Sequence, residues 1–187
     1  DYGSIGTNWA IPVGESSQTF TVPIYGDKVF EADETFAVHV ANAVNATIVD
    51  GDAIGTISND DQPPPELSIA DVSVSEGNSG TKLATFTVSL NKPAIEAVSF
   101  NIGTTWHPGQ TAEAGSDFDS HFGFITIPVG ATSATFDVTI KGDTDFESDE
   151  FFQVDVDSVL GATVVDGLAD GTITNDDPRP TPNIAVG

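Results

Sequence analysis

The fold is decided by residues 136–150, which read FDVTIKGDTDFESDE. Phe136, Val138 and Ile140 alternate with polar residues, so they share one face of an extended segment. The rest of the stretch carries five carboxylates, at positions 143, 145, 147, 149 and 150. We therefore expect a half-buried strand that runs directly into an acidic loop.

The same arrangement occurs earlier in the chain, at residues 20–34 (FTVPIYGDKVFEADE). Residues 1–61 and 117–177 align without a gap at an offset of 116 and agree at about half of their positions, which indicates an internal repeat. Both copies end in Asn-Asp-Asp, at 59–61 and 175–177. The predicted organisation is an incomplete repeat at 1–61, a proline-rich linker at 62–65, a complete repeat at 66–177, a second proline-rich linker at 178–182, and the start of a further repeat at 183–187.

Alternation of period two also dominates the rest of the complete repeat, as in residues 84–90, 98–102 and 152–156. Turn-forming residues separate these stretches, notably EGNSG at 76–80 and NKP at 91–93, and no segment holds a helical period. Seven or so short strands in about 110 residues are typical of two packed sheets. The predicted class is all-β, with immunoglobulin-like antiparallel β-sandwich repeats in tandem.

The composition excludes several classes of partner. Five Lys and Arg stand against 29 Asp and Glu, which gives a formal net charge of −24 at pH 7. Such a chain repels nucleic acid and anionic lipid and attracts cations. It has no Cys, which excludes disulfides and thiolate metal sites, and it has no apolar run near the ~20 residues of a membrane helix. We expect no nucleic-acid partner and no direct membrane insertion.

The acidic stretch predicts a cation site. Two carboxylates ~4 Å apart repel by ~1 kcal/mol in water and by ~4 kcal/mol at an effective dielectric near 20, and a bound cation reverses that term. Calcium accepts six to eight oxygen ligands in loose geometry, so it suits a loop without nitrogen ligands better than magnesium does. An EF-hand is excluded, because the loop has neither the required glycine nor flanking helices.

Four segments together resemble the Calx-beta family. They are Ser75-Glu76-Gly77, then 114–118 (AGSDF), then 143–150 (DTDFESDE), then 171–177 (GTITNDD). The family is named for calcium-binding domains of sodium/calcium exchangers and recurs in tandem in large extracellular bacterial proteins. The resemblance implies a seven-stranded sandwich with calcium ions held by loops at one end.

The resemblance also implies a set of ligands. In the complete repeat they are Glu76, Asp117, Asp143, Asp145 through its main-chain oxygen, Glu147, Glu150, Asp176 and Asp177. In the incomplete repeat they are Asp1, Asp27, Glu31, Glu34, Asp60 and Asp61. Asn175 and Gly142 stand where calcium-rich members carry acids, so we expect fewer ions than those members bind. The incomplete repeat lacks a counterpart of Glu76, which predicts a weaker site.

These features lead to one functional expectation and two alternatives. We expect a calcium-binding, calcium-rigidified structural repeat of a large extracellular surface, adhesion or filament-forming protein. The alternatives are a regulatory calcium sensor and a carbohydrate-binding accessory module of a larger secreted protein. We do not expect an enzyme, because carboxylates held on a cation stay ionised and no nucleophile or phosphate-binding motif is present.

Possible partners follow from three parts of the sequence. Neighbouring repeats of the same protein would adjoin through the proline-rich linkers. The strand expected at 183–187 could pair with another copy head to tail by strand addition. Trp106 could either fold back onto its own domain or stack on a glycan or another cell-surface ligand.

Overall fold

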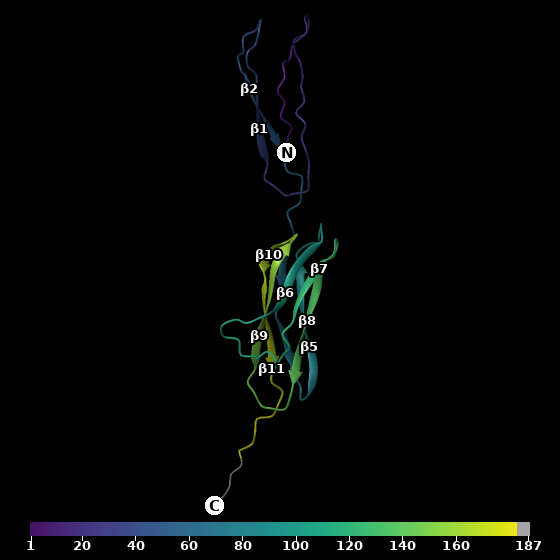
Figure 1. Cartoon of the computed structure of the whole chain (residues 1–187), viewed down its shortest axis with the longest axis vertical. Coiled ribbons are helices and arrows are strands. Elements are labelled where there is room, and N and C mark those ends of the chain that lie inside the picture. Colours follow the sequence, from purple (N-terminus) through teal and green to yellow (C-terminus); the bar gives the residue numbers. More distant parts are fainter. Residues whose placement is uncertain (183–187) are drawn as a thin grey trace, which may run out of the picture. The chain divides into compact units, whose positions relative to one another are not determined.

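The computed structural model describes residues 1–182 and divides into two compact units, Asp1–Pro63 and Pro64–Gly187. Both units consist of strands and loops, and residues 1–182 contain no helix (Figure 1). Consequently, the described part of the chain offers no helix that is long and apolar enough to cross a membrane. The strand predicted at 183–187 lies outside the described residues.

The second unit is a sandwich of two sheets. One sheet has the order β10 (Thr163–Asp166), β3 (Glu66–Ile69), β5 (Gly80–Leu90) and β8 (Ser133–Gly142). The other has the order β4 (Val72–Ser75), β11 (Leu168–Thr174), β9 (Glu150–Leu160), β6 (Val98–Thr105) and β7 (Phe122–Ile127). The all-β sandwich prediction is therefore confirmed.

Alternating apolar residues of both sheets form the core between them. The apolar residues that were predicted to face inward on β5, β6, β8 and β9 are all buried; Ala84 is the first of them in the chain and Val156 the last. Phe152 lies at the centre, where its ring stacks on Phe118 with centroids 4.6 Å apart and meets Phe86 edge-on at 5.9 Å. The long β6–β7 loop is thus fixed to the core through Phe118.

Two strand pairs differ from the antiparallel expectation. β3 pairs with β10 and β4 pairs with β11 in parallel, whereas the other pairs are antiparallel. The reason is that the first stretch of the unit, residues 66–75, divides into two short strands and passes from one sheet to the other. Parallel pairing brings the ends of β4 and β11 together at one end of the sandwich.

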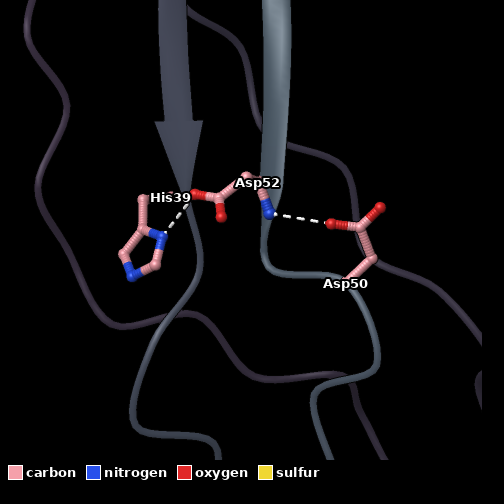
Figure 2. Close-up of polar contacts among 3 residues, drawn as sticks. All are labelled: His39, Asp50 and Asp52. Carbon is pink, nitrogen blue, oxygen red and sulfur yellow. Dashed lines mark hydrogen bonds and ion pairs between the residues drawn. The ribbon is translucent and has the colours of Figure 1, made fainter.

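The first unit contains a two-stranded antiparallel sheet of β1 (Glu34–His39) and β2 (Asp52–Ile57). None of its residues 1–63 is fully buried, although Trp9, Phe30 and Ile54 are large apolar side chains. At the end of the hairpin, the His39 ring lies 2.6 Å from Asp52 through Nδ1, and the Asp52 amide donates to Asp50 (Figure 2). In the second unit, the positions that match His39 and Asp52 in the repeat hold Asp155 and Leu168. The His–Asp pair is therefore confined to the first unit.

Candidate metal centre

Two groups of carboxylates lie at one end of the second unit. Glu76, Asp176 and Asp177 form one group, and Asp117, Glu147 and Glu150 form the other; in each group one oxygen per residue lies within 4.8 Å of the others. In the first group Glu76 follows β4 and the two aspartates follow β11, and these strands are parallel neighbours. Their C-terminal ends therefore deliver the three acids to the same place.

The second group is assembled from three parts of the chain. Glu150 opens β9, Glu147 belongs to the loop before it, and Asp117 comes from the β6–β7 loop. The Lys141 amide donates to the Asp117 carbonyl at 2.8 Å, which holds that loop against the end of β8. Asp117, which lies 30 and 33 positions before its two partners in sequence, is thus placed beside them by the bond between its loop and β8.

Two of the three carboxylates of the first group are buried to an unusual degree, whereas that of Asp176 is exposed. Glu76 is 4% exposed and Asp177 is 6% exposed. Within residues 1–182, Oε1 of Glu76 and Oδ2 of Asp177 have no hydrogen-bond partner, although Asn78 Nδ2 donates to the other oxygen of Asp177 at 2.6 Å. Burying a carboxylate oxygen without a partner is costly, and a cation bound between these oxygens removes that cost. The donor set, which is oxygen only, fits calcium.

Burial and, after it, the mutual repulsion of the acids raise the pKa values of three of them. Burial, followed by the charges of Asp143 and Glu147, raises the pKa of Glu76 to about 7. Burial, followed by a hydrogen bond to Asp117 and the charge of that residue, raises the pKa of Glu150 to about 7. The pKa of Glu147 is raised as well, first by burial and then by Asp117. Without a cation, this cluster therefore holds protons near neutral pH.

Protein donors also shape the site. Asp176 accepts from Ser75 Oγ at 2.9 Å and from the Gly77 amide at 3.0 Å, so it ties the turn after β4 to the end of β11. Lys82 Nζ donates to the Ser75 carbonyl at 2.7 Å. Sequence reasoning missed the roles of Ser75 and Asn78 as donors, because nothing in their local pattern indicates that they reach Asp176 and Asp177, about 100 positions away. It also missed the bond from Lys82 to Ser75.

Asp149 and Asn175 form a clamp between the acidic loop and the last strand. The Asn175 amide donates to Asp149 Oδ1 at 3.1 Å, and Asn175 Oδ1 accepts from the Glu147 amide at 3.3 Å. The first unit repeats both bonds. There the Asn59 amide donates to Asp33 Oδ1 at 2.9 Å, and Asn59 Oδ1 accepts from the Glu31 amide at 3.2 Å. Asp149 and Asn175 thus position the loop by hydrogen bonding, and the repetition of both residues was the available signal.

Asp143 and Asp145 lie outside both tight groups. The Asp145 amide donates to Asp143 Oδ1 at 2.7 Å, which forms a local turn. The charge of Asp143 acts on Glu76 and Glu147, and the charge of Asp145 acts on Glu147. Their assignment as ligands stays a prediction.

The first unit brings together three of its six predicted ligands. Asp1, Glu31 and Glu34 form a group with oxygens within 4.8 Å, and all three are exposed. Asp27 accepts from the Val29 amide at 2.7 Å, in the same turn as its counterpart in the second unit. Asp60 and Asp61 lie outside that group, so the six-ligand site of the first unit stays a prediction.

Comparison with known proteins establishes the family. The Calx-beta domain profile matches residues 1–61 and 58–177, which together span most of the chain. The chain belongs to the Calx-beta domain family. Calx-beta is a family of non-catalytic, calcium-binding domains, which supports the calcium-binding class predicted from the sequence.

Solved structures agree with the fold. The apo-form Calx CBD1 domain is 22% identical with a TM-score of 0.51, and the alignment covers 62% of this chain and 100% of that one. CBD12 from CALX1.2 is 23% identical with a TM-score of 0.52, over 60% of this chain and 46% of that one. At this identity the likeness concerns the fold alone.

One curated relative is much longer than this chain. Adhesion G-protein coupled receptor V1 of Danio rerio is 27% identical over 165 residues, which is 81% of this chain and 2% of the receptor. The chain therefore spans only a small fraction of the length of the curated relative that it matches.

Proposed function

We propose that the chain is a calcium-rigidified structural repeat of a larger extracellular surface or adhesion protein. The burial of Glu76 and Asp177 with unpartnered oxygens supports this proposal most strongly, because a cation is the partner that such oxygens need. The similarity to an adhesion receptor supports the extracellular, adhesive setting.

Calcium would act as a cross-link between elements that are far apart in sequence. An ion in the first group joins the end of β4 to the end of β11, and an ion in the second joins the β6–β7 loop to the start of β9. Because the ion binds only the folded state, it adds ~2.7 kcal/mol of stability when calcium is 100-fold above its dissociation constant.

Calorimetric titration of calcium into the metal-stripped chain, combined with melting curves, tests the proposal. We expect millimolar binding and a large rise in melting temperature, both of which Asp143→Ala and Asp176→Ala diminish. Micromolar binding with little stabilisation would favour the alternative of a regulatory sensor. If the chain bound no calcium, the acids would be a solubility surface and the proposal would be wrong.

A partner proposal concerns the first unit, whose large apolar residues are not buried within residues 1–63. Strand addition from the 183–187 segment of another copy would cover part of this face and link copies head to tail. That segment lies outside the described residues. Sedimentation equilibrium at high protein concentration with calcium tests the contact, and a strictly monomeric chain would contradict it.

A further inference from the structure

The β6–β7 loop contains a hollow that the calcium groups do not explain. Its volume is about 380 Å³, within the range of about 300–1,000 Å³ that is usual for small-molecule pockets. Trp106 and Gln110 line one part of it, Glu113 and Ser120 line another, and the buried side chains of Ala112 and Phe118 contribute apolar surface. The hollow is therefore mixed in polarity and contains an aromatic ring.

Trp106 is not used to fill the core. It is 76% exposed, although a tryptophan buries more apolar surface than most side chains when it packs against its own domain. Of the two alternatives given for Trp106, folding back onto its own domain therefore does not hold for most of its surface. An exposed indole beside a hollow offers a flat apolar face to a ligand.

Two polar side chains of the hollow are also available. The carboxylate of Glu113 and the hydroxyl of Ser120 make no hydrogen bond within residues 1–182. A sugar ring has an apolar C–H face and a rim of hydroxyls, so it needs both kinds of surface that the hollow provides. We propose that the hollow beside Trp106 binds one neutral sugar residue, with the ring against the indole and its hydroxyls directed to Glu113 and Ser120.

The charge of the chain restricts the sugar. The formal net charge is −24, and Glu113 adds a carboxylate to the hollow itself. Acidic sugars are therefore repelled, whereas neutral hexoses and N-acetylhexosamines are not.

The wall of the hollow is tied to the second carboxylate group, so this inference rests on the proposed function. Asp117 Oδ2 accepts from the Glu113 amide at 2.5 Å, while the same carboxylate belongs to the group with Glu147 and Glu150. The Thr111 and Ala112 amides donate to the carbonyl of Phe151, the residue after Glu150. A calcium ion that fixes Asp117 and Glu150 also fixes this wall, and the coupling works in both directions.

Saturation-transfer NMR with free monosaccharides tests the assignment. The neutral probes are glucose, galactose, mannose, fucose and N-acetylglucosamine, and the acidic probes are glucuronic acid and N-acetylneuraminic acid. We expect about millimolar binding of at least one neutral sugar, and of no acidic one, with calcium present. Trp106→Ala should weaken this binding at least tenfold, whereas the matched variant Trp9→Ala, which changes an exposed indole of the first unit, should leave it unchanged.

Each remaining outcome decides a part of the inference. The sugar assignment is overturned if no neutral sugar binds, if Trp106→Ala binds as the unchanged chain does, or if a tetralysine peptide binds at Trp106 in place of the sugars. Equal sugar affinity with calcium and with chelator would overturn the coupling. Calcium binding is measured separately by calorimetry, so a failure of the sugar site leaves the calcium proposal standing and a failure of calcium binding is seen directly.

Discussion

Replacing Gly142 with alanine should weaken calcium binding without unfolding the second unit. Gly142 ends β8 and pairs with Gly80, and the turn after β4 passes directly over it. An added Cβ would lie 2.0 Å from the Gly77 carbonyl oxygen and 2.7 Å from that of Glu76. Ordinary contact begins at 3.4 Å, so the turn must move by 3.4 − 2.0 = 1.4 Å.

A displacement of this size matters because Glu76 is held by that turn. Calcium–oxygen distances span only 2.3–2.6 Å, and the other two acids of the first group, Asp176 and Asp177, follow β11 and are not part of that turn. By analogy with other residues that orient metal ligands, we expect a 10- to 100-fold loss of calcium affinity. Overpacking should also lower the free energy of unfolding by ~1–3 kcal/mol in the calcium-free protein.

The first unit supplies the control. Gly26 occupies the matching position, and a Cβ added there meets nothing within 4 Å. Gly26→Ala should therefore change neither the calcium affinity nor the free energy of unfolding. Calorimetry is best done in a Glu31→Gln, Glu34→Gln background, which removes two of the three acids of the first unit's group. Unchanged calcium affinity in a folded Gly142→Ala chain would refute the claim that the packed turn positions Glu76.

Three further predictions concern protonation, the clamp and the core. Because the pKa values of Glu76 and Glu150 are raised to about 7 from 4.5, the folded state binds more protons than the unfolded state between these values. The calcium-free protein should therefore lose stability as pH rises from 4.5 to 7, and calcium affinity should increase over the same interval. Urea unfolding at pH 5.5 and 7.5 measures the stability, and calorimetry at the same two values measures the affinity. A pH-independent affinity would contradict the assignment. Asp149→Ala removes the acceptor of the Asn175 amide and should lower the free energy of unfolding by ~1 kcal/mol. Asp149→Asn keeps an acceptor oxygen and should largely retain the free energy of unfolding. Equal losses for the two variants in urea unfolding would argue against the clamp. Phe152→Ala opens a cavity at the centre of the core and should cost ~3–5 kcal/mol in the same assay, so a loss below 1 kcal/mol would show that the ring is not packed as described.

The sequence by itself determined the sandwich and the location of its acids. Alternation places Phe136, Val138 and Ile140 on one face whatever the rest of the chain does, because a strand has a period of two. The gap-free repeat showed that the acidic loop and the closing Asn-Asp-Asp belong together. Both features are local or periodic, so they can be read without knowing which strands are neighbours.

Only the tertiary structure decided how the acids are divided and how deeply they lie. Glu76 meets Asp176 and Asp177 because residues 66–75 cross between the sheets and β4 runs parallel to β11, a pairing that no local pattern encodes. The burial of Glu76, and the exposure of Trp106, depend on which segments pack over them. Ligand grouping is a property of where strand ends meet, so it is fixed by sheet topology and not by spacing along the chain.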